Sequence, residues 1–254
     1  MGQSNIDLTG QVAIVTGGTR GLGRVVAARL AACGAQVTVC GRNAPDDLPA
    51  GLAFHAADVR DPDSARALVD AVFARHGRID ILVNNAGGSP QAPAATASPR
   101  YFDAILRLNL HAPMYLAQAA FAHMQPARRG SIINIASVSG IRPSPMTAAY
   151  GAAKAGLLNL TQSLAQEWGP DGVRVNAIIA GLMQTEMSGA TYGDAAAQAA
   201  VAQSMPLQRM GTGGDIAGAV LWLCSDLSAW VSGARINVDG GGERPYFLDL
   251  VKGD

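Results

Sequence analysis

Charged residues, aromatic residues and histidine are all scarce in this sequence. Charged residues make up 15% of the 254 positions, and 19 basic side chains balance 19 acidic ones. A chain without net charge has no electrostatic attraction for nucleic acid or for an anionic membrane surface, so neither is expected as a partner. Near-zero net charge also favours self-association, and we therefore expect a homo-oligomer, either a tetramer or a dimer.

Cysteine is rarer still, and its spacing excludes two further classes of protein. Cys33, Cys40 and Cys224 have neither the even number of a disulfide framework nor the paired spacing of a zinc site. Because they lie in apolar segments, we expect buried, reduced thiols and a cytoplasmic location. The four histidines show no metal-ligand spacing, so no metal is expected. The sequence also lacks the features of a signal peptide and any apolar run long enough to cross a bilayer.

What is abundant is apolar and small residues, arranged in alternating segments. Short β-branched runs, typical of buried strands, lie at 11–16, 36–40, 52–57, 79–83, 131–136, 172–179 and 234–239. Segments with helical periodicity lie between them, at about 24–33, 61–76, 100–124, 149–168 and 213–225. This alternation predicts an α/β protein with a Rossmann-type, doubly wound parallel sheet of about seven strands and helices on both faces. Without a repeat or a linker, residues 1–254 are expected to form one domain with a lid near 181–206.

A glycine-rich turn joins the first predicted strand to the first predicted helix. The turn runs from Gly17 to Gly23 and contains Gly18, Arg20 and Gly21. Glycines permit a tight turn and a close approach of the backbone, and the start of a helix offers free N–H groups and a positive dipole end. The turn is therefore predicted to bind phosphate groups. The alternative is that the glycines serve chain reversal alone.

The end of the second predicted strand bears on the choice of dinucleotide. A carboxylate there would bind the adenosine ribose of NAD, whereas an arginine suits the 2′-phosphate of NADP. This strand ends in Gly41 and Arg42, and Arg20 lies in the preceding glycine turn. Two arginines and no acid favour NADP(H). NAD(H) stays possible if both arginines are merely solvated.

Tyr150 and Lys154 are four residues apart in an alanine-rich segment that is predicted to be helical. Residues at this spacing lie on the same face of a helix, so the phenol and the ammonium would be neighbours. A positive charge nearby favours the phenolate, which would allow tyrosine to exchange protons near neutral pH. On its own the spacing is equally compatible with a tyrosine and a lysine that have no chemical role.

The glycine turn, Tyr150 and Lys154 belong to a longer series of motifs. In chain order the series is Thr16–Gly23, Asp58, Asn84–Gly87, Asn109, Ser137, Tyr150, Lys154, Asn176, Gly181, Thr185 and Val238–Gly241. Together they resemble the short-chain dehydrogenases/reductases, of the single-domain kind that includes 3-oxoacyl-[acyl-carrier-protein] reductases. The resemblance covers roughly residues 8–242 and implies an NAD(P)-dependent oxidoreductase. One departure is Ala180-Gly181 where the family usually has Pro-Gly, which predicts a looser turn at that position.

The resemblance implies a catalytic set of four residues. Tyr150 would be the general acid and base, Ser137 would hydrogen-bond the substrate oxygen, and Lys154 would lower the Tyr150 pKa and hold the nicotinamide ribose. Asn109 would steady a water molecule that links Lys154 to solvent. The implied cofactor contacts are Gly17, Thr19, Arg20, Gly21, Leu22, Gly23, Arg42, Asp58, Val59, Asn85, Ala86, Gly87, Tyr150, Lys154, Gly181 and Thr185.

The substrate is less well defined by the sequence. Ser137, Ser139, Tyr150, Leu182 and Met183 are expected to contact it, in a wider pocket that adds Gly88, Ser89, Ile141, Arg142, Met146, Met187 and Tyr192. These residues, mostly small or apolar, predict a moderately hydrophobic ketone or secondary alcohol. Arg142 either meets an anionic group of the substrate or is solvated. The apolar segment 243–250 is expected to pack across a subunit interface.

Three functions therefore remain open. The leading one is an NADP(H)-dependent reductase of a ketone or 3-oxoacyl group. The second is an NAD-dependent alcohol, sugar or hydroxysteroid dehydrogenase. The third is a non-catalytic nucleotide sensor or scaffold on the same fold, which would have no chemical need for the four catalytic residues.

Overall fold

A seven-stranded parallel sheet forms the centre of the computed structural model, which describes residues 6–186, 188–243 and 245. Its order is β3-β2-β1-β4-β5-β6-β7, and every neighbouring pair is parallel. The strands are β1 (Val12–Thr16), β2 (Gln36–Gly41), β3 (Leu52–Ala56), β4 (Ile81–Asn84), β5 (Gly130–Ser137), β6 (Val173–Ala180) and β7 (Arg235–Val238). The strand order changes direction between β1 and β4, so the doubly wound topology is confirmed.

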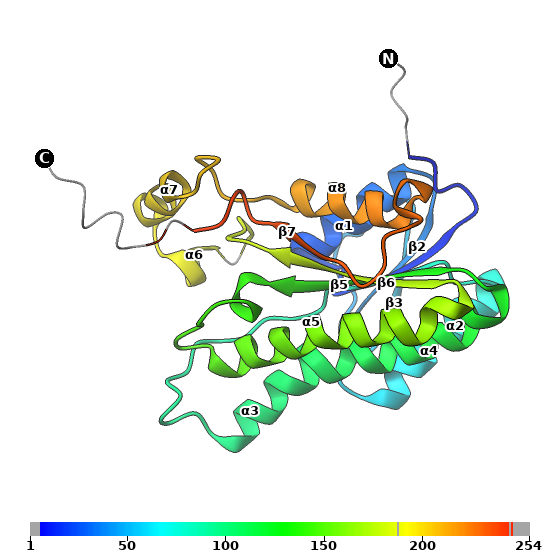
Figure 1. Ribbon diagram of the computed structural model, residues 1–254, viewed down its shortest axis with the longest axis horizontal. Helices are drawn as coiled ribbons and strands as arrows, with labels where there is room; N and C mark the ends of the chain where they lie inside the picture. The colour runs from blue at the N-terminus through cyan, green and yellow to red at the C-terminus, as the bar shows by residue number, and fades with distance from the viewer. Residues whose placement is uncertain (1–5, 187, 244, 246–254) are drawn as a thin grey trace, which may run out of the picture.

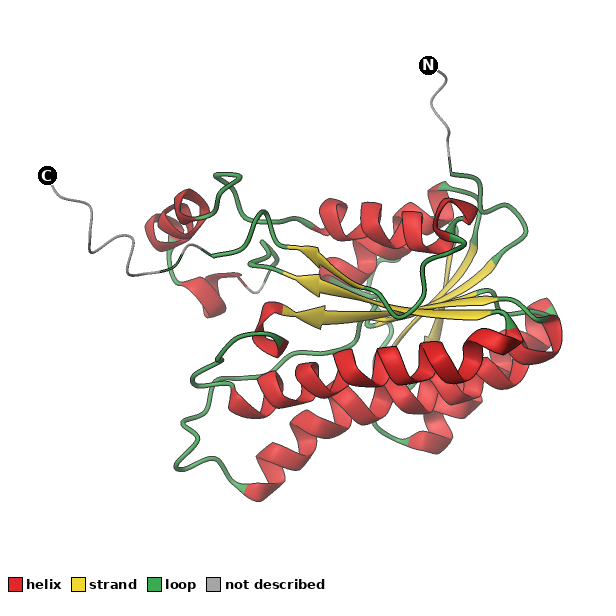
Figure 2. Ribbon diagram, in the orientation of Figure 1, coloured by secondary structure: helices red, strands yellow, loops and turns green. Residues whose placement is uncertain are grey.

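Helices cover both faces of the sheet. Figures 1 and 2 show one layer above the sheet and a second, longer layer below it. The upper layer contains α1 (Gly21–Ala32) and α8 (Gly213–Cys224), and the lower layer contains α2 (Pro62–His76), α4 (Ala112–Ala127) and α5 (Ala148–Trp168). Each layer encloses its own apolar core against the sheet. Since both faces are covered, β1 and β4 are buried along their whole length, which explains their continuous apolar sequences.

Local sequence signals set the ends of several helices. Asp61 accepts a hydrogen bond from the Asp63 N–H at the start of α2, and Pro62 occupies the first helical position. The same helix ends at Gly77, whose φ of 71° is the left-handed conformation that glycine adopts without strain. Because these residues mark both ends of α2, the helix predicted at 61–76 agrees with the observed one to within one residue.

One region differs from the prediction. The expected helix at 100–124 is divided into α3 (Pro99–Leu106), a π-helical turn η1 (Arg107–His111) and α4. The region of the expected lid contains α6 (Ser188–Tyr192) and α7 (Ala195–Ser204), the latter capped by Asp194. Both helices lie beyond the carboxyl ends of β5, β6 and β7 (Figure 1). Within the described residues, no helix has the length and apolar character to cross a membrane.

Candidate active site

A cavity of about 840 Å³ opens at the carboxyl ends of the strands, where the strand order reverses. Most of the residues singled out from the sequence line it: Gly17, Thr19, Arg20, Gly21, Leu22, Arg42, Asp58, Val59, Asn85, Ala86, Gly87, Ser137, Ser139, Tyr150, Lys154, Gly181, Leu182, Met183 and Thr185. Among the residues implied for catalysis and for cofactor binding, Gly23 and Asn109 do not line it. Of the lid, the part that reaches the cavity ends at Tyr192, and α7 contributes no lining residue.

The glycine turn has the geometry that an anion requires. Gly17 and Gly21 have φ values of 62° and 55°, which only glycine adopts easily. The N-terminus of α1 follows, and no side chain caps it, so its first N–H groups are open to a ligand. Gly23 has a different role from the predicted one. A Cβ at this position would lie 2.3 Å from Asn85 Nδ2 and 2.5 Å from the Gly17 oxygen, so Gly23 permits packing behind the turn.

Thr16 fixes the second wall of the cofactor region, a role that the sequence did not reveal. Its Oγ1 accepts hydrogen bonds from the backbone N–H groups of Asn85, at 3.0 Å, and Ala86, at 2.9 Å. The Asn85 side chain donates in turn to the Thr16 carbonyl oxygen at 2.9 Å. Thr16 therefore ties the end of β1 to the turn after β4. In the sequence Thr16 is the last residue of the first predicted strand and the first residue of the glycine motif, and neither position predicts this contact.

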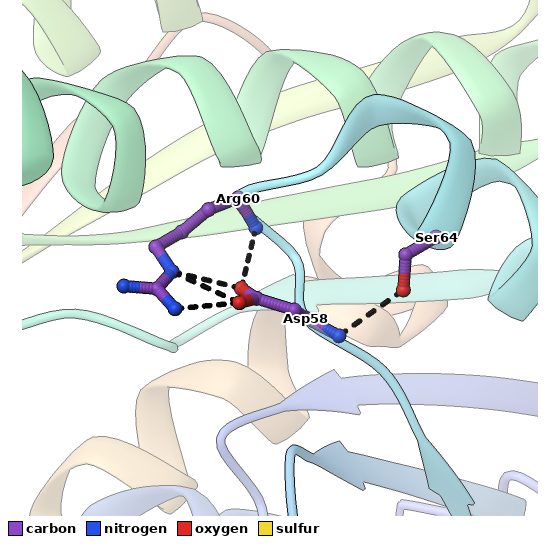
Figure 3. Close-up of polar contacts among 3 residues, drawn as sticks. All are labelled: Asp58, Arg60 and Ser64. Carbon is purple, nitrogen blue, oxygen red and sulfur yellow. Dashed lines mark hydrogen bonds and ion pairs between the residues drawn. The ribbon is translucent and has the colours of Figure 1, made fainter.

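At the far end of the cavity, Asp58 is paired with Arg60 (Figure 3). The Arg60 guanidinium donates to both carboxylate oxygens, with an Nε–Oδ1 distance of 2.9 Å, and the Asp58 N–H donates to Ser64 Oγ. The hydrogen bonds from Arg60 hold the pKa of Asp58 below its ordinary value. Arg20 and Arg42, by contrast, form no ion pair with any described residue. Arg60 is a lining residue that sequence reasoning missed, since it only follows the recognised Asp58-Val59.

Three of the implied catalytic residues lie together, where the carboxyl end of β5 meets the first turns of α5. They are Ser137 on β5 and Tyr150 and Lys154 on α5. The Ser137 side chain lies near enough to the Tyr150 phenol to lower its pKa, and its Oγ accepts a hydrogen bond from the Ser139 N–H at 3.2 Å. Lys154 is 3% exposed, its Nζ donates to the Ile135 carbonyl at 2.7 Å, and it lies 5.5 Å from the centre of the Tyr150 ring. The helical spacing predicted from the sequence therefore places the phenol and the ammonium side by side.

Burial has the largest effect on the Tyr150 pKa in this structure, and the lowering of that pKa by Lys154 stays a prediction. Burial raises the pKa of Tyr150 above its ordinary value, and Ser137 only partly opposes this. Burial also lowers the pKa of Lys154 to about 8. Lys154 is removed from water, and its ammonium donates to the Ile135 carbonyl.

Asn109 lies in the π-helical turn η1 and is fully buried. Its Nδ2 donates to the carbonyl oxygens of Gly88 and Ile105, both at 3.0 Å, and its Oδ1 accepts from the Gly88 N–H at 2.9 Å. Asn109 therefore holds the turn after β4 in place. A π-turn inside a helix is common at functional sites, and nothing in the apolar periodicity marks it.

Comparison with known proteins places this geometry in a family. The family model described as enoyl-(acyl carrier protein) reductase matches residues 17–243. Gluconate 5-dehydrogenase of Gluconobacter oxydans is 36% identical over 92% of this chain and 95% of its own length, and 3-oxoacyl-[acyl-carrier-protein] reductase of Escherichia coli is 34% identical over 93% and 98%. This chain is a short-chain dehydrogenase/reductase.

A solved short-chain dehydrogenase/reductase has the same fold. A structure from Agrobacterium tumefaciens, described as a 2-deoxy-D-gluconate 3-dehydrogenase with bound NADP, is 36% identical and superposes with a TM-score of 0.86. The superposition covers 94% of this chain and 98% of the chain from Agrobacterium tumefaciens. The present short-chain dehydrogenase/reductase is thus an NAD(P)-dependent oxidoreductase that acts on alcohol or ketone substrates. Its open helix N-terminus, its glycine turn and its two unpaired arginines fit such a dinucleotide.

The part of the cavity wall expected to meet the substrate is formed by the end of β5, the loop after it and the lid. Ser137 is the last residue of β5, Ser139 and Arg142 follow it, and the lid contributes Leu182, Met183 and Tyr192. Ile141 and Met146 are 51% and 43% exposed and do not line the cavity. Met187 lies outside the described residues, as do 244 and 246–250 of the apolar segment expected at an interface.

The turn at Ala180-Gly181 is firmly held by its neighbours. Ala180 is paired with Ser137 on one side and with Val238 on the other, and the Gly181 N–H donates to the Val238 carbonyl at 3.0 Å. A Cβ on Gly181 would lie 2.6 Å from the Asp239 Cα, so close packing requires glycine here. The looser turn expected from the missing proline is not observed in the strand pairing.

The cysteines and potential metal ligands complete the description. Cys40 and Cys224 are buried, and burial raises their pKa values to about 11 and about 12. Cys33 is only half-buried, which corrects the expectation that all three thiols are buried. Among the described residues, no group of three or more His, Cys, Asp or Glu side chains is arranged to hold a metal ion.

Proposed function

We propose that this protein is an NADP(H)-dependent reductase that converts a ketone or a 3-oxoacyl group into a secondary alcohol, with Tyr150 as the acid and base. The observation that supports the proposal is that the hydroxyl groups of Ser137 and Tyr150 share the wall of the cavity with the buried Lys154, whose Nζ lies 5.5 Å from the centre of the Tyr150 ring. Two hydroxyl groups on one carbonyl oxygen suit a reaction in which negative charge develops on that oxygen.

Each residue has a defined task in this proposal. Ser137 donates a hydrogen bond to the substrate oxygen, and the Tyr150 phenol transfers its proton to that oxygen as the alcohol forms. Burial keeps the pKa of Tyr150 above its ordinary value, so the phenol is protonated at neutral pH and ready for reduction. Lys154 holds the ribose hydroxyls next to the nicotinamide. The bound dinucleotide supplies the hydride, while the protein contributes position and electrostatics.

The proton on Tyr150 must be replaced after each reduction. A Cβ on Gly87 would lie 2.8 Å from Asn109 Oδ1 and 3.3 Å from Lys154 Nζ, so the lack of a side chain leaves space between these two groups. A water molecule in that space would connect Lys154 with the solvent side of the cavity. The geometry supports Asn109 as a residue that positions this relay, with its own side chain committed to Gly88 and Ile105.

NADP(H) is the favoured dinucleotide. Arg20 and Arg42 line the cavity and form no ion pair with a described residue, so both guanidiniums are available for a 2′-phosphate. Gly41 brings no carboxylate to the same position. The related structure from Agrobacterium tumefaciens, with NADP bound, is consistent with this choice.

A second candidate is NAD-dependent oxidation of an alcohol, a sugar or a hydroxysteroid. Relatives named gluconate 5-dehydrogenase and, from Mycolicibacterium smegmatis, D-threitol dehydrogenase keep this function open, the latter at 36% identity over 92% of the chain. The same Ser137, Tyr150 and Lys154 would serve it, with Tyr150 accepting the proton of the alcohol.

The test begins with fluorescence titrations of the purified protein with NADPH and with NADH. Tighter binding of NADPH is expected, and tighter binding of NADH would favour the second candidate. Reduction of ketones and 3-oxoacyl thioesters is then compared with that by Tyr150→Phe. Loss of the general acid should lower kcat by about 10²-fold to 10⁴-fold or more, while the Kd for NADPH stays nearly unchanged. Comparable turnover by Tyr150→Phe would refute the mechanism.

A further inference from the structure

Arg142 is the cationic side chain at the substrate end of the cavity, and it is paired with a carboxylate from far along the chain. Its Nε lies 2.5 Å from Glu243 Oε2, and its Nη2 donates to Glu243 Oε1 at 2.6 Å. The two residues are 101 positions apart, one in the loop after β5 and the other after β7. Arg142 lines the cavity, whereas Glu243 does not. The planar fork of the guanidinium therefore already binds a carboxylate with two bonds.

Arg142 shares the cavity with the phenol assigned to catalysis. Tyr192, on the lid helix α6, lies near enough to the ion pair for Glu243 to raise its pKa and for Arg142 to lower it. All three of Arg142, Tyr150 and Tyr192 line the same cavity. A ligand whose oxygen meets Tyr150 can therefore extend past Tyr192 toward the guanidinium.

The remaining cations of the cavity have other tasks. They are Arg20, Arg42, Arg60 and Lys154. The first two lie at the glycine turn and at the end of β2, Arg60 is bound to Asp58, and Lys154 is bound to the Ile135 carbonyl. Arg142 alone among the lining cations of the described chain belongs to the loop that carries the substrate residues Ser137 and Ser139.

We propose that Arg142 is an anion subsite, which binds a carboxylate carried by the carbonyl substrate, and that Glu243 is an internal carboxylate which that group displaces. The inference rests on the proposed function for the chemistry at Tyr150 and adds the class of substrate, an oxo acid or the corresponding hydroxy acid. The ligand exchanges one carboxylate for another, so the charge around Arg142 is unchanged.

The exposure of the pair makes this exchange feasible. The side chains of Arg142 and Glu243 are 39% and 35% exposed. An ion pair in such a setting contributes about 0 to 1 kcal/mol, which is a small cost for the displacement of Glu243. A substrate carboxylate can form the same two charge-assisted bonds with the Arg142 guanidinium, so the exchange replaces what the internal pair loses.

The test uses a series of straight-chain oxo acids of increasing length, beginning with levulinate, each paired with its primary amide as the neutral control. Wild-type protein should reduce the acid with a higher kcat/KM than the amide at the best chain length. Arg142→Gln should lower kcat/KM for the acid by about 10-fold to 100-fold, as expected for a lost charge-assisted bond, and change that for the amide by less than about 3-fold. The effect should appear mainly in KM.

Glu243→Gln separates the anion subsite from a purely structural role of the pair. If Glu243 competes with the substrate, this variant should lower KM for the acid by up to about 5-fold and leave the amide unchanged. If the pair only fastens two segments together, both variants break it and should shift the acid and the amide in the same direction. That result, or equal kcat/KM for acid and amide in wild type, would overturn the inference.

Arg129→Gln is the matched control. It removes another half-exposed arginine of an ion pair, at the opposite end of the same strand β5, and should leave both substrates unaffected. Its partner, the buried Asp80, keeps a second ion pair with Arg78. If wild type binds NADPH but reduces no carbonyl, the proposed function fails separately. The subsite is then decided by calorimetric titration of levulinate and its longer homologues into the NADP⁺-saturated protein. The anion subsite is supported if wild type binds the oxo acid and Arg142→Gln does not. It is refuted if wild type and variant bind the oxo acid with equal affinity, or if wild type does not bind it.

Discussion

Replacement of Arg42 by glutamine, alone and together with Arg20→Gln, should remove the preference for NADPH. Both guanidiniums line the adenosine side of the cavity, both are exposed, and neither forms an ion pair with a described residue. The third arginine in this region, Arg60, cannot replace them because Asp58 occupies it. In the proposed NADP(H)-dependent reductase, selectivity for a 2′-phosphate is therefore expected to depend on Arg20 and Arg42.

The size of the effect follows from this exposure. A hydrogen bond to a charged group contributes about 1.5 to 3 kcal/mol when it is shielded, and exposed ion pairs contribute about 1 kcal/mol or less. An intermediate value of about 1 to 2 kcal/mol for each arginine corresponds to an increase of roughly 5-fold to 30-fold in the Kd for NADPH. The Kd for NADH, which has no 2′-phosphate, should change by less than about 2-fold.

Fluorescence titration of the bound dinucleotide gives both constants for wild type, each single variant and the double variant. Arg129→Gln serves again as the control, because Arg129 lies at the opposite end of the sheet. Added salt should reduce the wild-type preference, since it screens exposed charges, and should have little effect on the preference of the double variant. A double variant that keeps the wild-type ratio of the two constants would refute the assignment of these arginines.

Three further predictions concern other parts of the site. Gly87→Ala places a Cβ 2.8 Å from Asn109 Oδ1 and 3.3 Å from Lys154 Nζ, so kcat should fall while NADPH still binds; unchanged steady-state kinetics would contradict the relay. Arg60→Gln leaves the Asp58 carboxylate uncompensated and should weaken NADPH more than NADH in the same titrations, and equal weakening would exclude this electrostatic role. Burial lowers the pKa of Lys154 from 10.5 to about 8, so the folded chain binds fewer protons there than the unfolded chain between these values. As pH increases from about 8 to 10.5, the free energy of unfolding of wild type should therefore rise by up to about 3 kcal/mol relative to that of Lys154→Met. Urea denaturation at several pH values measures this. If the difference in unfolding free energy between the two proteins did not depend on pH, Lys154 would not be a buried ammonium.

The sequence by itself determined the fold class and the order of the elements. Apolar runs of strand length, helical periodicity and capping residues such as Asp61 and Gly77 are local properties, so they can be read before the chain is folded. The same holds for Tyr150 and Lys154, because helix geometry alone places residues four apart on one face. The glycine turn was equally visible, since its glycines are required by backbone conformation.

Contacts between distant segments could be decided only by the tertiary structure. Thr16 holds the turn at Asn85 across 69 positions, and Arg142 meets Glu243 across 101. The opposite pKa shifts of Tyr150 and Lys154 also arise from burial, which depends on everything that packs around them. Sequence patterns identify which residues can do chemistry, but the solvent exposure and the partners that set their charge exist only once the chain has folded.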